Sequence, residues 1–470
     1  MSPTEGPNWL ARVRGLATPR EDAPPTPIPG DEAAETLDCH LDGARTTDGQ
    51  RLVIHGWVAG IDTGTLFLAD ADRAGTPRRL DPVVTPRADV SAHLVNLGRR
   101  VTTDRHGFVA TVQQDEPWPS MMRLCLVADG KASWSPAFEV KIERIPLMAL
   151  LGITIAVARQ CSGRMSEAVE RLARPLVNQP PAPPTVVEVR VFEPPGAPVH
   201  VTPRVSVVIP FYGEGHYLLD HLVAQSRAPM DIEWIMVCDD PRLAHELTQI
   251  ITSRRSAIRQ TTSIVYLGAN GGFAHANNIG VAHAKGRYVL LMNSDVYCRD
   301  FSFLERGVSI LEQDQRTGGV GFSMQFEDGT VQHDGMTFRR VPWFDDLWAS
   351  EHPRKGMPHD WPAPPESNVE AVTAALMLLR RADFADAIVF DPGYIVGDFE
   401  DADLCLRLRE MGKTIALVRT DEIWHLERQS VRHIADNDGR RAITLLNCLR
   451  FNTRWDAMIE RDHREQGRES

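Results

Sequence analysis

The sequence predicts two domains of different class: an all-β, sandwich-like domain at residues 36–145 and an α/β domain at residues 203–435. The first prediction rests on short stretches of alternating apolar and polar residues, separated by Gly-, Asp- and Pro-containing turns. The second rests on a strand–helix–strand rhythm whose strands are continuously apolar, as buried parallel strands are. A length of 470 residues fits two or three domains of roughly 100–200 residues each.

Composition narrows the class of protein. A chain with 43% hydrophobic and 24% charged residues can bury a large core. The net charge of -12 argues against a nucleic-acid partner, which would require a basic stripe. The seven cysteines include no CxxC pair, so we expect a reducing compartment rather than a disulfide framework or a cysteine zinc site. The N-terminus lacks the features of a signal peptide, and the longest apolar run, 145–158, is too short to span a membrane. We therefore expect a cytosolic, soluble chain.

The N-terminal half divides into three predicted parts. Residues 1–35 are proline-rich and are expected to form a flexible segment. Residues 36–145 show no long helical period, and their alternating strands include 52–58, 66–68, 124–126 and 138–142. Residues 146–202 combine an apolar run, an amphipathic helix that Pro175 ends, and a proline-rich spacer, where we place the main domain boundary.

The α/β pattern begins at residue 203. The predicted strands are 205–210, 233–240, 263–267 and 288–292, and the predicted helices are 217–225, 243–254 and 274–284. In a doubly wound sheet, ligands bind at the carboxyl ends of the strands. Polar residues stand at those ends, at Pro210–Tyr212, Asp239–Asp240 and Asn293–Asp295. A C-terminal helical segment at 436–470 follows, with a helix expected over 436–458.

Asn293-Ser294-Asp295 is the first candidate site, because an acid after a buried strand projects into the ligand crevice. One carboxylate plus phosphate oxygens is a usual arrangement for Mg²⁺, and Mn²⁺ also tolerates nitrogen. The alternative is an ordinary turn, since Asn, Ser and Asp are turn residues.

The second candidate is the acidic start of a helix, residues 398–403. Leu404, Cys405, Leu408 and Met411 define its expected buried face, with Gly412 as C-cap and Asp398 as a candidate N-cap. Acids in a first helical turn are favoured by the helix dipole, which also holds them in the charged form and makes them weaker bases. The segment contains more acidic residues than the capping of one helix requires. One of them could therefore deprotonate an incoming hydroxyl.

Two further signals are weaker. His425 follows the apolar strand 415–418; it is either a packed histidine or a partner of a carboxylate on Mn²⁺. The glycine-rich segment 268–280 could bring backbone close to a ligand, or could simply be a loop that needs positive φ. It has neither a GxGxxG motif nor a Walker lysine.

Taken in order, these residues resemble the inverting family-2 glycosyltransferases of GT-A fold, and within them bacterial rhamnosyltransferase-like members. The matching series is 205–210, Asp239-Asp240, 270–274, 276–280, 286–295, 373–381, 400–409 and His425. The series departs from the family pattern at Gly213, where an Asn is usual, and at Pro241 after the acid pair. Residues 36–145 lie outside the resemblance.

The resemblance implies roles for individual residues. Asp401 is the implied base, with Glu400 beside it, and Asp295 and His425 are the implied ligands of Mn²⁺ or Mg²⁺. Asp239 is implied to hold the nucleotide base. The implied nucleotide-sugar-binding set is Pro210, Tyr212, Asp239, Asn270, Gly272, Phe273, Asn277, Asn278, Asn293 and Ser294.

The resemblance also implies an activity. The expected reaction moves a sugar from a nucleoside-diphosphate donor, most simply a UDP- or dTDP-sugar, to a hydroxyl of a glycan or lipid-linked acceptor in bacterial surface polysaccharide biosynthesis. The expected location is cytoplasmic, either free or peripheral at the inner face of the membrane, and a homo-oligomer stays open as an alternative to a monomer. The segment 341–368, with Trp343, Phe344, Trp348 and Trp361, is either an acceptor loop or a surface insertion.

Two other functions remain open from the sequence. One is a glycan-binding or assembly protein with a degenerate α/β domain, in which Trp57 and Trp134 stack on sugars instead of filling a core. The other is a sugar-nucleotide pyrophosphorylase, although the loop after the first strand, 211–215, is acidic and lacks a basic phosphate-binding residue.

Overall fold

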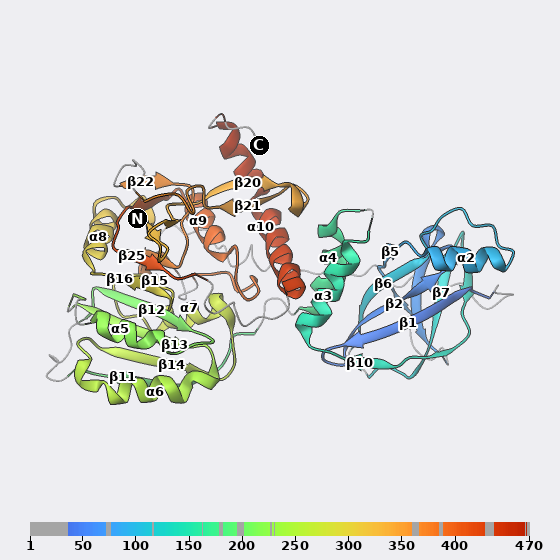
Figure 1. Ribbon diagram of the computed structural model, residues 1–470, viewed down its shortest axis with the longest axis horizontal. Coiled ribbons are helices and arrows are strands. Elements are labelled where there is room, and N and C mark those ends of the chain that lie inside the picture. Colours follow the sequence, from blue (N-terminus) through green and yellow to red (C-terminus); the bar gives the residue numbers. More distant parts are fainter. Residues whose placement is uncertain are drawn as a thin grey trace, which may run out of the picture. The chain divides into compact units, whose positions relative to one another are not determined.

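The computed structural model in Figure 1 describes residues 36–71, 77–114, 117–161, 163–177, 182–194, 202–225, 228–229, 231–359, 366–384, 389–427, 437–465 and 467. The predicted flexible segment at 1–35, much of the proline-rich spacer, and Trp361 lie outside these residues. The chain forms two compact units, one of residues 1–179 with 438–442 and one of residues 180–437 with 443–470.

The N-terminal unit is built from two sheets that share one hydrophobic core. The first sheet has the order β10-β1-β2-β6-β5, with β1 at Cys39–Thr46, β2 at Arg51–Val58, β5 at Val83–Thr85, β6 at Gly107–Gln113 and β10 at Ile142–Arg144. The second has the order β4-β3-β7-β8, with β3 at Thr65–Asp70, β4 at Arg78–Arg79, β7 at Met121–Ala128 and β8 at Lys131–Trp134; β9, Phe138–Glu139, also pairs with β7. Leu52 and Ile54 of one sheet and Leu66 and Leu124 of the other belong to the same buried cluster. The predicted β-rich domain is confirmed.

Helices are present in this unit as well. The short helix α2, Ala88–Asn96, lies inside the stretch for which no long helical period was expected, and it buries only Val90 and Leu94. Helices α3, Leu147–Ala158, and α4, Met165–Ala173, follow the last strand. The Thr111 hydroxyl of β6 donates to the carbonyl of Leu172 in α4, which ties this helix to the outer face of the first sheet.

The second unit holds a nine-stranded sheet of order β11-β14-β13-β12-β15-β23-β17-β24-β22. The strands are β11 Val186–Phe192, β12 Val205–Phe211, β13 Ile232–Cys238, β14 Thr262–Leu267, β15 Tyr288–Met292, β17 Thr317–Phe322, β22 Glu366–Val369, β23 Leu376–Arg380 and β24 Thr414–Val418. Strands β14, β13, β12 and β15 run parallel, and β23 runs antiparallel to β15. The predicted strand–helix alternation therefore produces a parallel half-sheet with its carboxyl ends at one edge.

Helices cover both faces of this sheet. They are α5 Tyr217–Gln225, α6 Ala244–Ser253, α7 Gly272–His283, α8 Ser302–Gln313, α9 Glu400–Glu410 and α10 Asn437–Glu465. Successive side chains of β12 point to opposite faces of the sheet. Val207 and Ile209 pack in the core with α5, α6 and α8. Val208 packs instead in the core with α7, α9 and α10. Both faces are buried, which is why these strands are continuously apolar.

Four local expectations change. Strand β11 lies within the range assigned to the helical and proline-rich linker, and it pairs with β14 at the sheet edge. Asp398 is not the N-cap of α9, since Phe399 occupies that position. Met411 is 49% exposed, because the helix ends at Glu410 and Met411 is its C-cap, with Gly412 following at a φ of 78°. Helix α10 extends beyond the expected 458 to Glu465.

Small strand pairs complete the second unit. They are β16 Val296–Cys298 with β25 Ile423–His425, β18 Met324–Gln325 with β19 Val331–His333, and the hairpin of β20 Thr337–Val341 and β21 Leu347–Glu351. Within the described part of the chain, no helix is both long and apolar enough to cross a membrane.

Candidate active site

The turn after β15 is held rigidly at the carboxyl edge of the sheet. The Asn293 N–H donates to the Ala375 carbonyl at 2.8 Å, at the point where the neighbouring strand β23 begins. From the other side, Nε2 of the buried His221 contacts the Ser294 carbonyl at 2.9 Å. Burial lowers the pKa of His221, so this ring is neutral near pH 7 and donates a fixed hydrogen bond. The turn therefore presents Asp295 in one defined direction.

Asp295 and His425 lie side by side. Strand β16 pairs with β25 so that Val296 stands opposite His425, and the Leu426 N–H donates to the Asp295 carbonyl at 3.1 Å. Asp295 Oδ1 lies 3.3 Å from His425 Nε2, with the two residues 6% and 7% exposed. The structure thus brings together two predicted residues that are 130 positions apart.

The pair has the chemistry and spacing of two ligands of one divalent ion. Two ligand atoms about 2.1 Å from a common ion are roughly 3 Å apart in octahedral geometry, close to the observed separation. Nδ1 of His425 is buried and has no hydrogen-bond partner in the described part of the chain, so Asp295 is the side chain that contacts this ring through Nε2. Among the described residues, no group of three or more His, Cys, Asp or Glu side chains is placed to hold a metal. Phosphate oxygens and water are ligands that could complete the coordination of such an ion.

Asp401 lies in the first turn of α9 and reaches toward the same edge. Its carboxylate accepts from the Ala402 N–H at 2.8 Å, and it also accepts from the Thr373 hydroxyl and the Ala374 N–H. Because Ala375 contacts Asn293, these bonds anchor the carboxylate beside the turn that carries Asp295. Burial raises the pKa of Asp401 despite the hydrogen bonds, which lower it. This direction is opposite to the expectation of a weaker base at the helix N-terminus, since desolvation exceeds the effect of the three hydrogen bonds.

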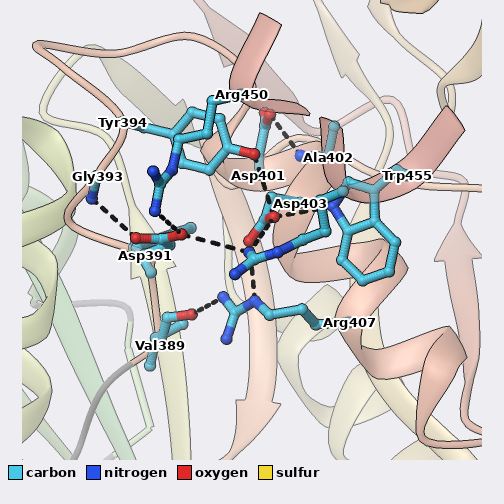
Figure 2. Close-up of polar contacts among 12 residues, drawn as sticks. Val389, Asp391, Gly393, Tyr394, Asp401, Ala402, Asp403, Arg407, Arg450 and Trp455 are labelled. Atoms are coloured by element: carbon cyan, nitrogen blue, oxygen red, sulfur yellow. Dashed lines mark hydrogen bonds and ion pairs between the residues drawn. The ribbon is translucent and has the colours of Figure 1, made fainter. Parts of the chain in front are cut away.

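Asp403, two residues further along, has a different environment. Its fully buried carboxylate accepts from four side chains: Tyr394 (3.1 Å), Arg407 (2.9 Å), Arg454 (2.6 Å) and Trp455 (2.9 Å). Figure 2 shows this cluster and, apart from it, the Asp401 carboxylate with a single drawn contact to Ala402. Asp403 joins α9 to α10, so this acid supports the fold and leaves Asp401 and Glu400 as the acids that remain candidates for chemistry.

The backbone before α9 is strained. Val396, Asp398 and Phe399 have φ values of 63°, 88° and 74°, a region that L-residues other than Asn and Asp rarely adopt. The Val396 carbonyl accepts from the Phe273 N–H at 3.3 Å, so this segment lies against the first turn of α7. Strain of this kind clusters at functional sites, where packing from both sides maintains it.

Two histidines that the sequence did not indicate extend the site. The Thr373 N–H donates to His333 Nε2 at 3.4 Å, and Nδ1 of His333 lies 3.0 Å from Nδ1 of His352. Because Nε2 of His333 accepts, its Nδ1 carries the proton and donates to His352. Burial lowers the pKa of both rings, to about 4 for His352. A neutral pair therefore lies behind Thr373, and no motif or periodicity marks either histidine in the sequence.

Asp239 and the glycine-rich loop form a second part of the edge. The Asp239 carboxylate accepts from the N–H groups of Gly271 at 2.7 Å and Gly272 at 3.1 Å, and Asn270 Oδ1 also accepts from Gly272 at 2.8 Å. Gly272 has a φ of 76°, which explains the need for glycine. Burial raises the pKa of Asp239 to about 7. The neighbouring Asp240 is instead bound by Arg242, which lowers its pKa.

The other implied nucleotide-sugar residues divide by their contacts. The Asn278 side chain bonds to the backbone of Val389 and Phe390, so it positions that segment. Asn277 donates to the Phe273 carbonyl one turn earlier, at 2.9 Å. Phe273 and Phe390 pack with ring centroids 5.3 Å apart. Pro210 and Tyr212 are half-buried at the end of β12.

The aromatic segment 341–368 is in part structural. Trp348 is fully buried on β21, and its indole N–H donates to Asp456 at 2.9 Å. This tryptophan therefore belongs to the core beside α10 and does not face a ligand. Phe344 is half-buried.

Comparisons with known proteins identify families and proteins that resemble the second unit. Residues 206–363 match the family described as Glycosyl transferase family 2. The O-antigen biosynthesis protein RfbC of Myxococcus xanthus is 28% identical over 247 residues, which are 50% of this chain and 18% of that protein. The putative teichuronic acid biosynthesis glycosyltransferase TuaG of Bacillus subtilis is 29% identical over 130 residues, 27% of this chain and 50% of that protein. The chain thus spans half or less of the length of these two relatives.

A solved structure, that of GalNAc-T7 with UDP, GalNAc and Mn²⁺, aligns at a TM-score of 0.37 and 16% identity, over 49% of this chain and 45% of that one. This likeness is too weak to assign a ligand. Residues 206–363 are therefore similar to glycosyl transferase family 2, and the expectation of an α/β domain preceded by a β-rich domain is confirmed.

Proposed function

We propose that the α/β unit is a metal-dependent, inverting glycosyltransferase that moves a hexosyl or deoxyhexosyl group from a nucleoside-diphosphate sugar to a hydroxyl of a glycan or lipid-linked acceptor. The observation that carries the proposal is the buried pair of Asp295 and His425 at the carboxyl edge of the sheet, 3.3 Å apart. The family match supports the class of reaction. The names of the two relatives support a role in bacterial surface polysaccharide biosynthesis.

Asp295 and His425 would hold Mn²⁺ or Mg²⁺, with a carboxylate oxygen and an imidazole nitrogen as ligands. When bound, the ion would supply positive charge against the diphosphate that leaves. His221 and the backbone bond of Asn293 keep the turn fixed, so Asp295 does not have to reorganise as the donor arrives.

Asp401 would act as the general base. Burial raises the pKa of this carboxylate, which makes it more basic than an exposed aspartate. The carboxylate takes the proton of the acceptor hydroxyl as that oxygen attacks the anomeric carbon from the face opposite the diphosphate. The carbon–diphosphate bond breaks in the same displacement, so no covalent enzyme intermediate forms and configuration inverts.

The strand edge would form the donor site. The proposed set, as implied by the family resemblance, is Pro210, Tyr212, Asp239, Asn270, Gly272, Phe273, Asn277, Asn278, Asn293 and Ser294. Their contacts indicate that Asp239 shapes the glycine-rich loop and that Asn278 holds residues 389–390, so both would act by positioning backbone. The donor would be a UDP- or dTDP-sugar, and the protein would work in the cytoplasm or at the inner face of the membrane.

A thermal-shift screen of sugar nucleotides, with and without Mn²⁺, tests the proposal. We expect one nucleotide class to raise the melting temperature only when the metal is present. Metal-dependent hydrolysis of that donor would separate a transferase from a degenerate glycan-binding protein. Pyrophosphate-dependent exchange would instead indicate a pyrophosphorylase, and the absence of any metal-dependent nucleotide binding would contradict the proposed site.

A further inference from the structure

The N-terminal unit contains a cavity of its own, lined by both apolar and polar side chains. The cavity measures about 220 Å³ and lies between helix α3 and the outer face of the sheet that contains β1, β2, β5 and β6. Val53, Val109, Ile153 and Val157 give it apolar walls. The polar side chains that line it are Asp42, Arg45, His55, Thr85, Arg87 and Gln160. Apolar walls with a few convergent polar groups are typical of small-molecule sites.

Glycines in the sheet make room for these polar side chains. A Cβ at Gly43 would come within 2.7 Å of His55 Nε2. A Cβ at Gly107 would lie 2.3 Å from the Thr85 hydroxyl and 2.7 Å from Cγ of Arg87. Three lining side chains therefore occupy space that any other residue at these two positions would fill. The room for these side chains therefore comes from the glycine positions in the sheet and not only from side-chain conformations.

Arg45 makes an unusual contact inside the cavity. Its Nη1 lies 3.0 Å from His55 Nε2, and since a guanidinium can only donate, the imidazole nitrogen must be the acceptor. His55 is therefore neutral, and burial together with the Arg45 charge lowers its pKa. Carboxylate and phosphate oxygens form stronger, charge-assisted bonds with a guanidinium than a neutral ring does. An anionic group that entered the cavity would replace His55 as the partner of Arg45 Nη1.

Arg87, the second guanidinium, is already engaged. Its Nε and Nη2 donate to the two Asp89 oxygens at 2.9 and 2.8 Å, and its Nη1 donates to Asp42 at 2.6 Å. Arg87 therefore orients Asp42, whose carboxylate retains further lone pairs for hydroxyl donors. Arg45 is engaged as well, because its Nε donates to the Glu143 carboxylate at 3.1 Å. Its Nη1, which faces the neutral His55, is the nitrogen that can meet an anion in the cavity, while Asp42 and Thr85 suit hydroxyl groups.

We propose that this cavity binds a single sugar unit that carries an anionic group, either a carboxylate or a phosphate. The anion pairs with Arg45, the ring hydroxyls bond to Asp42 and Thr85, and the apolar face of the ring packs against the valine and isoleucine side chains. The volume suits one sugar ring and is below the range of about 300–1,000 Å³ usual for drug-sized ligands. The proposal does not depend on the transferase site.

Calorimetry on the full chain tests the proposal, with EDTA present so that a metal-dependent donor site does not contribute. The probes are glucuronate, glucose 6-phosphate, glucose and inorganic phosphate. We expect at least one of the two acidic sugars to bind tenfold or more tightly than glucose and inorganic phosphate. Which acidic sugar binds identifies the anion. Arg45→Gln should weaken that binding at least tenfold, whereas Arg79→Gln, an exposed arginine on the other sheet, should leave it unchanged.

A second measurement needs no variant. The imidazole resonances of His55 in the unaltered full chain should shift when the acidic sugar is added and should not shift with glucose, because only an anion draws Arg45 away from the ring. Equal binding of glucose or of inorganic phosphate, binding that persists in Arg45→Gln, or unmoved His55 resonances would each overturn the proposal.

Discussion

The two candidate sites differ in where the fold puts their polar side chains. In the α/β unit, the polar groups stand after the last residue of a strand, as Asp239 follows β13 and Asn293 follows β15. In the N-terminal unit they stand within strands: His55 lies in the middle of β2 and Arg45 near the end of β1, on the face that α3 covers.

The difference explains why one site was predictable and the other was not. Parallel strands bring all their carboxyl ends to one edge, so any polar residue after an apolar run is a candidate. On an antiparallel sheet one face is commonly solvated, so a polar residue in the middle of a strand is predicted to be exposed to solvent. Only the position of α3 shows that His55 and Arg45 face a cavity.

Loss of the Asp295 carboxylate should have the largest effect on the strand-edge site. Asp295→Ala should abolish donor turnover and leave the melting temperature of the unliganded protein close to that of the original, because the turn keeps its backbone bonds. Metal-dependent hydrolysis of the sugar nucleotide measures the effect. The matched control is Asp421→Ala, an exposed acid four residues before His425. Full activity in excess chelator would contradict a metal role for Asp295.

Asp401→Asn should lower transfer by about 10²-fold or more, the usual scale for loss of a general base. Sugar-nucleotide binding should hardly change. Because burial raises the pKa of Asp401, the rate of transfer should begin to fall with decreasing pH at a higher pH than an ordinary aspartate would produce. This acidic limb of the pH–rate profile should disappear in the variant. Glu400→Gln is the control. If Glu400→Gln is inactive and Asp401→Asn active, the base is assigned one residue too late.

The separation of the two regions can be tested by truncation. A chain of residues 180–470 should fold and hydrolyse donor, because the second unit has its own cores. A chain that starts at residue 200 removes β11 and leaves β14 as an open edge, which favours aggregation. We therefore expect the shorter chain to be less soluble in a sedimentation assay. Loss of donor hydrolysis in a soluble 180–470 chain would show that the site needs the N-terminal unit.

Sequence reasoning predicted elements well where the period was strong. The helix over 217–225 and the strand over 288–292 have the observed bounds of α5 and β15. It failed where tertiary contacts decide the role of a residue. Asp401 and Asp403 are two positions apart on α9, about 200° around the helix, so one meets Thr373 and the other meets α10. Both are acids in a first turn, and the sequence does not distinguish them. His333 and His352 meet only because the strands around them fold together.

The smallest expected effect concerns the protonation of Asp239. Burial raises its pKa to about 7, whereas an aspartate in the unfolded chain titrates near its ordinary value of about 3.9. Between these two values the folded chain keeps a proton that the unfolded chain releases. The contribution of Asp239 to the free energy of unfolding is therefore present at low pH and is lost as pH rises toward 7, by up to about 1.4 kcal/mol per pH unit.

Asp239→Asn removes this titration. The difference in the free energy of unfolding between the original protein and the variant, from urea denaturation between pH 4.5 and 8, should change steadily with pH and level off above about pH 8. Asp240→Asn is the control and should give a difference that stays flat over this range, because Arg242 lowers the pKa of Asp240 and its contribution is lost only below about pH 4. If the difference for Asp239→Asn does not depend on pH, the carboxylate is ionised throughout. In that case the hydrogen bonds from the N–H groups of Gly271 and Gly272, and not burial, determine the pKa of Asp239. The strand edge is then more polar than the small exposed fraction of Asp239 indicates.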